Sequence, residues 1–462
     1  MGGMRNLYNS GISMRTLLTL LAVGGLTAAA QAPSAVAIRN AKVVTVSGPA
    51  LTRGTVVLRN GLIEAVGENI TVPADAYVVD GESLTVYPGL IDGLSNWGLP
   101  AARAPLAPGG RGGRGGGAQR VAPATAPGTP PPPPAKGPED RPATTSWIKA
   151  ADELQANDRR FEQARNAGFT SAATFPMRGI FCGQGSFINL AGDKPGDMVL
   201  IPSLGQFLTL SPSGNGFPMA LFGTIAYIRQ IYLDAGHYTL ARDAYARDPR
   251  SGPRPEYDRA LEGVLESPRI LLPANRVVEV DRMLRFAAEL KRPAVLYGLR
   301  EGYRSADLLK KAGATVLVSL KWPEKDREVD PDEPEAYRVL EVRDKAPSTP
   351  AELRKAGIKF ALYSDGLDQA RDLLRAIKTA IDAGLAREDA VRALTLSPAE
   401  IYGVADRLGS IEKGKIANLL VTRGEIFDDR TKVEMVFIDG KRFIPAPEAA
   451  PAKPAPSGNQ AQ

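Results

Sequence analysis

The stretch GLIEAVGENITVPADAYVVDGESLTVYPGLID, residues 61–92, decides the fold that this sequence predicts. It is rich in β-branched residues and starts at the Asn60-Gly61 dipeptide, which favours a two-residue β-hairpin turn. A similar β-branched run occupies residues 37–46, and a third strand leads into the closing PGLID. These runs predict a compact β-unit at the start of the folded chain.

The second half of the chain alternates strands and helices. Short apolar runs predict strands at residues 269–273, 294–297, 315–320 and 359–363. Helical spacing predicts helices between and around them at residues 152–166, 220–246, 277–290, 303–312, 351–356, 367–383 and 387–403. Two more strands are expected at 418–422 and 433–438. Alternation of this kind indicates a parallel sheet with right-handed crossovers, and hence an α/β fold.

A second long stretch, residues 394–443, contains Ser397-Pro398, then LGSIEKGKIANLLV at 408–421, then VFIDGKRF at 436–443. Together with residues 61–92, this stretch resembles the two ends of the amidohydrolase superfamily, in its imidazolonepropionase-like branch. The resemblance implies a (β/α)8 TIM-like barrel with a small β-sandwich formed from the N- and C-terminal segments. Catalytic groups of such barrels lie at the carboxyl ends of the strands.

The resemblance and the composition together predict the domain boundaries. The segments are a signal peptide at 1–32, the N-terminal part of the β-sandwich at 33–87, the barrel at 88–384, the last helix with the C-terminal part of the sandwich at 385–444, and a disordered tail at 445–462. A Gly/Arg/Pro-rich insertion at 100–145 interrupts the barrel and is expected to be disordered, because it cannot bury enough apolar surface to offset its ordering entropy.

The family's metal-binding histidines are missing from this sequence. After PGLID, the family has His-x-His, and Leu94 and Asn96 stand at those two positions. The fifth-strand histidine is replaced by Pro273 in PRILLPANR, and the sixth-strand one by Tyr297 or its neighbour. Only the eighth-strand aspartate remains, as Asp365, which is therefore the single candidate catalytic residue.

The missing imidazoles decide the metal expectation. The family would use zinc or another divalent metal to acidify a bound water and polarise the substrate carbonyl. Zinc of that kind needs about three protein ligands, and the one histidine, His237, lies in a helix where a solvated or capping role is expected. We therefore expect no metal ligand and no cofactor in this chain.

An oxygen-only site is the alternative. Asp92, Asn96, Ser364 and Asp365 could converge on a hard cation such as Ca2+ or Mg2+. The simpler expectation is that the two carboxylates only accept hydrogen bonds from backbone amides. Cys182, the one cysteine, is expected to be an inert packed residue without a neighbouring base.

The charge of the chain does not indicate a nucleic-acid partner. The formal net charge is +6, but residues 101–145 alone carry six basic and two acidic residues and so supply most of the excess. Arg15, the apolar run at 16–26 and the small-x-small site at 30–32 predict a secretory signal, with no span left after cleavage. The protein is thus expected to be periplasmic or extracellular.

The predicted function is that of a degenerate, exported amidohydrolase. Its ancestral activity, hydrolysis of non-peptide carbon–nitrogen bonds, would be lost or weak, and the chain would serve as a binding or partner subunit. The resemblance implies a homo-oligomer, or a hetero-oligomer with an intact homologue, and leaves a small-molecule ligand open. The alternative is an active hydrolase for cyclic amides or related small substrates, working through a reduced or metal-free site with Asp365 as base.

The mature protein should begin at or near Pro33, because the apolar run is followed by the Ala30-Gln31-Ala32 cleavage site. Intact-mass spectrometry of the exported protein measures this directly. Exported protein that retains residues 14–32 would contradict the expectation.

Overall fold

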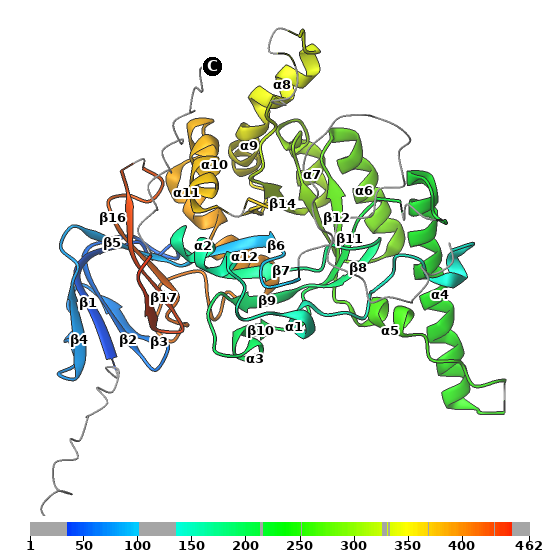
Figure 1. The fold of residues 1–462 in the computed structure, drawn as a ribbon, viewed down its shortest axis with the longest axis horizontal. Helices are drawn as coiled ribbons and strands as arrows, with labels where there is room; N and C mark the ends of the chain where they lie inside the picture. Colours follow the sequence, from blue (N-terminus) through cyan, green and yellow to red (C-terminus); the bar gives the residue numbers. More distant parts are fainter. Residues whose placement is uncertain are drawn as a thin grey trace, which may run out of the picture.

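The computed structural model of this protein describes residues 35–100, 135–212, 216–250, 252–325, 330, 333–367, 369–428 and 430–445. The predicted signal peptide, the part of the insertion between 101 and 134, and the tail from 446 lie outside these ranges. The described elements form an α/β structure, with a β-rich part at one side of a larger body of mixed strands and helices (Figure 1).

The first sheet joins the two ends of the chain. Its order is β18-β17-β16-β5-β1-β2-β3, and β4 also pairs with β1. The bounds of these strands are β1 Ala35–Val43, β2 Leu51–Arg59, β3 Leu62–Gly67, β4 Ala76–Asp80, β5 Leu84–Pro88, β16 Leu419–Arg423, β17 Lys432–Ile438 and β18 Lys441–Phe443. In Figure 1 the blue N-terminal strands lie beside the red C-terminal ones. Ile38, Val56, Leu419 and Phe437 share one apolar cluster, so the two ends form one core as predicted.

The hairpin turns of this sheet follow from the sequence. Asn60 and Gly61 connect β2 to β3 with φ of 51° and 79°, and Asp439 and Gly440 connect β17 to β18 with φ of 50° and 72°. Two consecutive residues of positive φ are what a tight type I′ turn requires, and Asn-Gly and Asp-Gly favour it.

Two further sheets carry the barrel strands, in the orders β10-β9-β7-β6 and β15-β14-β13-β12-β11-β8. Their bounds are β6 Leu90–Ser95, β7 Phe169–Thr174, β8 Phe181–Gln184, β9 Ser186–Asn189, β10 Val199–Ile201, β11 Gln206–Leu208, β12 Ile270–Ala274, β13 Ala294–Gly298, β14 Thr315–Ser319 and β15 Phe360–Tyr363. Strands β11 to β15 are parallel, as are β6 and β7. The predicted parallel sheet is confirmed.

The two barrel sheets adjoin at both of their edges. At one edge the backbone N–H of Ser364, just after β15, donates to the Asp92 carboxylate on β6. At the other edge β8 continues into β9 through Gly185. A Cβ on Gly185 would lie 2.1 Å from the Phe175 ring, so only glycine lets the chain pass from one sheet to the other here.

The β8–β9 segment runs antiparallel to all three of its neighbours: β8 pairs with β11, and β9 pairs with β7 and β10. One apolar cluster lies inside the strands and contains side chains from both sheets: Ile91, Phe187, Phe207, Leu317 and Tyr363. The strands therefore surround a packed apolar interior, which is typical of a (β/α)8 barrel.

The helices cover the outside of these strands. Those of at least seven residues are α2 Arg160–Asn166, α4 Leu221–Arg247, α5 Arg259–Glu266, α6 Val277–Leu290, α7 Ala306–Ala312, α8 Tyr337–Lys345, α9 Thr349–Lys355, α10 Ala370–Asp382, α11 Arg387–Ala393 and α12 Leu396–Tyr402. Shorter ones are α1 Ala150–Glu153, α3 Pro195–Met198, and the 3-10 turns η1 Pro138–Asp140, η2 Gly302–Arg304 and η3 Ala346–Ser348. None of the helices in the described ranges is long and apolar enough to cross a membrane.

Two predicted helices are wrong as single helices. The one expected at 152–166 is split into α1 and α2, because Asp158 accepts the backbone N–H groups of Gly98 and Arg160 and holds the chain in a turn. The one expected at 387–403 is split into α11 and α12. Its break comes at Thr395, whose φ and ψ of −133° and −83° are not helical.

Part of the predicted insertion is ordered and packed. The insertion was expected to be disordered up to residue 145, but residues 135–145 contact α4 and α5. Arg141 binds Asp234 at 2.5 Å and Asp258 at 3.2 Å, and the Thr144 hydroxyl lies 2.6 Å from the Tyr227 hydroxyl. The prediction is therefore wrong for this part, because partners distant in sequence supply the interactions that its own composition lacks.

Candidate functional site

The carboxyl ends of the barrel strands are the place where a (β/α)8 fold carries reactive groups. Leu94 on β6 stands at one family histidine position, and its side chain is buried at 2% exposure in the barrel interior. Pro273 on β12 lies directly opposite Tyr297 on β13 in the parallel register. Pro273 stands at the expected fifth-strand ligand position. The pairing therefore places Tyr297 at the corresponding position on the sixth strand.

Tyr297 fills this region instead of ligating. Its hydroxyl donates to the backbone carbonyl of Leu208 at 2.9 Å, and its ring lies 4.9 Å from the Phe207 ring. Burial raises the pKa of the Tyr297 phenol far above its ordinary value, so the group stays neutral. An uncharged phenol already donating to a carbonyl is a poor ligand for a divalent metal.

The Asn96 side chain is hydrogen-bonded to the positively charged Arg160. Its Oδ1 accepts a hydrogen bond of 3.0 Å from Arg160, whose guanidinium also binds Asp158. The side-chain oxygen that could have served a metal is thus occupied by a positive charge. A second cation at the same oxygen would be repelled.

Asp92 is fully buried between β6 and the end of β15. Its Oδ1 accepts the backbone N–H of Leu94 at 3.2 Å and that of Ser364 at 3.1 Å, while Oδ2 has no hydrogen-bond partner. Burial raises the pKa of this carboxyl to about 7, against the lowering effect of the Ser364 hydrogen bond. The expectation that Asp92 accepts backbone amides is confirmed.

Asp365, the candidate catalytic residue, lies in the turn after β15. Its φ of 51° is in the left-handed region, which Asp tolerates better than most residues. Its Oδ2 accepts a 2.7 Å hydrogen bond from the hydroxyl of Ser319, the last residue of β14. Asp365 is thus bound by a side chain, where a backbone amide was expected.

Three of the residues proposed for a hard cation bind different partners through their side-chain oxygens, and the fourth, Ser364, donates its backbone N–H to Asp92. Asn96 binds Arg160, Asp92 binds backbone amides inside the barrel, and Asp365 binds Ser319. Within the described parts of the chain, no group of three or more His, Cys, Asp or Glu residues is placed to hold a metal. His237 is exposed in α4. The residues present at the barrel mouth do not fit the zinc or other divalent metal that the family would use.

Cys182 is a packed residue, as predicted. It lies in the barrel interior at 1% exposure, and its Sγ donates to the carbonyl of Gly179 at 3.2 Å. Burial raises the pKa of the thiol to about 12, so no thiolate is available for nucleophilic attack at neutral pH.

Two residues of this region were not predicted from the sequence. Ser319 could have been found, because a polar residue at the end of a predicted barrel strand is a candidate by position. Arg160 could not, because nothing in the sequence links it to Asn96 across the insertion.

Comparison with known proteins supports the fold. Residues 325–443 match the amidohydrolase family. An amidohydrolase from Thermotoga maritima MSB8 has the same fold, with a TM-score of 0.70 and 24% identity over 89% of this chain and 100% of its own. Phenylurea hydrolase B covers 89% of this chain and 97% of its own at 15% identity and a TM-score of 0.51. No curated protein matches the sequence.

Asp92 generates a pH-dependent prediction. Its folded pKa of about 7 lies above the ordinary value of 3.8 for an aspartate, so the folded chain binds the proton more tightly than the unfolded one. The group therefore costs no stability below pH 3.8, and its cost grows with pH until it is complete above about pH 7. Asp92→Asn keeps the Oδ1 acceptor and removes the titration. Between about pH 5 and pH 8 the natural chain should lose ~2–3 kcal/mol of unfolding free energy relative to this variant.

Urea unfolding at the two pH values measures this difference. Asp193→Asn is the matched control, because the Asp193 side chain is 86% exposed and its removal should leave the pH dependence unchanged. Parallel stability curves for Asp92→Asn and the natural chain would show that Asp92 does not hold a proton when buried.

Proposed function

We propose that this protein keeps the amidohydrolase fold without metal-dependent hydrolysis, and that it acts outside the cytoplasm as a binding or partner subunit. The observation that carries the proposal is the occupation of the family's ligand positions. Leu94, Asn96, Pro273 and Tyr297 offer a buried alkyl group, an amide bound to arginine, a pyrrolidine ring and a neutral phenol. None of them replaces an imidazole nitrogen.

The chemistry of amide hydrolysis explains why this loss is severe. Bound zinc lowers the pKa of its water to about 7 and stabilises the charge that develops on the carbonyl oxygen. Asp365 alone would have to provide a base without that electrophile, and its carboxylate is engaged by Ser319. A general base contributes about 10²–10⁴-fold, far less than a complete hydrolytic site.

Retention of the fold supports a binding role. The chain aligns with the full length of the Thermotoga maritima amidohydrolase, and the barrel interior is closely packed with apolar and aromatic side chains. A barrel that remains intact while its reactive groups are gone is suited to present a surface or hold a ligand. We infer that an intact homologue is its partner.

Metal content tests the catalytic half of the proposal. After dialysis against a metal-buffered solution, the protein should hold less than about 0.2 equivalents of zinc. Asp365→Asn should change neither the metal content nor any background hydrolysis of amide, lactam or cyclic urea substrates. Asp243→Asn, at an exposed position of α4, is the control for handling and purity. Near-stoichiometric metal that disappears in Asp365→Asn, together with a hydrolytic rate, would restore the enzyme.

Solution mass and co-expression test the partner half. With an intact amidohydrolase of the same source, the protein should elute as one complex whose mass, by light scattering, equals the sum of both chains. Full activity of that homologue alone and separate elution of the two chains at ~50 μM would refute the partner role, because a functional subunit binds well below that concentration.

A further inference from the structure

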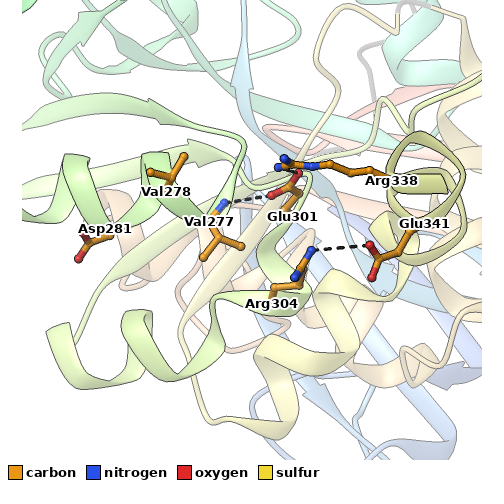
Figure 2. Close-up of a pocket in the computed structure, with 7 residues that line it drawn as sticks. All are labelled: Val277, Val278, Asp281, Glu301, Arg304, Arg338 and Glu341. Atoms are coloured by element: carbon orange, nitrogen blue, oxygen red, sulfur yellow. Dashed lines mark hydrogen bonds and ion pairs between the residues drawn. The ribbon is translucent and has the colours of Figure 1, made fainter. Parts of the chain in front are cut away.

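A cavity of about 660 Å³ lies on the rim of the barrel, and none of its lining residues stands at a family ligand position. Its walls come from the start of α6, the η2 turn that follows β13, and α8 (Figure 2). This volume is within the range of about 300–1,000 Å³ that small-molecule sites occupy. The cavity thus has room for a ligand, and its lining decides which chemistry it accepts.

Glu301 fixes the inner wall. Its residue exposure is 4%, and its carboxylate accepts the backbone N–H of Val277 at 3.2 Å and the Arg338 guanidinium at 3.0 Å. Both oxygens of this buried charge are therefore occupied. Glu301 holds Arg338 in position, and its own charge is neutralised before any ligand arrives.

Arg304, at the end of the same η2 turn, also lines the cavity. Its Nη1 lies 3.7 Å from Glu341 Oε2, which is too long for a hydrogen bond. Its side chain is 49% exposed and that of Arg338 63%, whereas the Glu341 and Glu301 side chains are 29% and 5% exposed. The positive groups are thus more open to a ligand than the negative ones.

An apolar strip completes the lining. Val277 and Val278 from the first turn of α6 border the cavity, and Val278 is 42% exposed. The remaining carboxylate, Asp281, is bound by Arg285 at 2.9 Å on the same helix. The Arg304 guanidinium, the exposed part of the Arg338 guanidinium that Glu301 does not occupy, and the valine strip therefore remain as the groups to which a ligand can bind.

We propose that this cavity binds a small carboxylate with a short branched apolar body. The carboxylate lies between Arg304 and Arg338 and receives one guanidinium on each oxygen, while the apolar body covers the valine strip. Charge-assisted hydrogen bonds of this kind are short, strong and specific for planar anions. The proposal does not depend on the loss of the metal site, since none of the lining residues stands at a family ligand position.

Such a ligand would also hold α8 more firmly against the barrel rim. This helix has no buried residue and supplies Arg338 and Glu341, both of which form ion pairs with residues of the barrel rim. Exposed ion pairs of this type contribute only about 0–1 kcal/mol each. A carboxylate that binds both arginines adds a bridge between α8 and η2, so amide hydrogen exchange in α8 should slow when it binds.

Three molecules of the same shape and different charge test the proposal. Isovalerate should bind the full-length protein with a dissociation constant on the order of 1 mM, as expected for a ligand of so few atoms. Isovaleramide and isoamylamine, the neutral and cationic counterparts, should not bind at ~20 mM. Saturation-transfer NMR and isothermal titration calorimetry at matched ionic strength measure the three affinities.

Arg304→Gln should weaken isovalerate binding about tenfold or more, because one charge-assisted bond is lost. Arg242→Gln is the matched control, since Arg242 is also 49% exposed and paired with a glutamate, but lies on α4. Three results would overturn the proposal: no binding of isovalerate, equal binding of isoamylamine, or the same affinity in Arg304→Gln as in Arg242→Gln.

Discussion

The antiparallel pairing of β5 with β16 is the constraint on which the rest of the structure depends. Residues 84–88 pair with residues 419–423, and β5 continues through Gly89 directly into β6 of the barrel. Asn418, just before β16, donates to Ser171 at 3.0 Å and to Asn189 at 2.8 Å, on barrel strands β7 and β9. The first sheet and the barrel are therefore joined both by the chain itself and by a buried polar network, whose members are costly to leave unpaired.

The barrel interior shows how a site can be lost without loss of the fold. A cavity lined by imidazoles would be unstable without its ion, because buried polar groups need partners. Here the space is filled by side chains that pack against one another, including Phe175, Phe207 and Tyr297. Tyr402 enters from α12 and donates to the carbonyl of Gly93 at 2.6 Å. The apolar part of the core is thus filled without a ligand, while Asp92 Oδ2 and the Gln206 side chain have no hydrogen-bond partner.

Much of the fold could be predicted from the sequence because the decisive signals are local. Residues 277–290 have strong helical periodicity and form α6, and the apolar run at 294–297 forms β13 with one residue added. The Asn60-Gly61 turn needs only its own two residues. In contrast, α8 has no buried face, so no apolar periodicity marked it in the sequence.

The site was predictable in its positions and not in its contacts. The spacing after PGLID located Leu94 and Asn96, but the guanidinium beside Asn96 comes from residue 160, beyond the long insertion. The proton on Asp92 likewise follows from complete burial, which arises only when β15 closes against β6. The cavity at the rim brings together segments around residues 277, 301 and 338, whose proximity depends on the sheet order.

The pairing of the two ends also sets the order in which the protein is completed during synthesis. Strands β1 and β5 are made early, yet the partner of β5 is among the last segments to be made. Until then the free edge of β5 can pair with another chain, and such edges promote aggregation. Contacts between segments so distant in sequence also slow folding. A chain that ends before residue 419 would keep this edge open permanently, so the last strands protect the newly made protein from self-association.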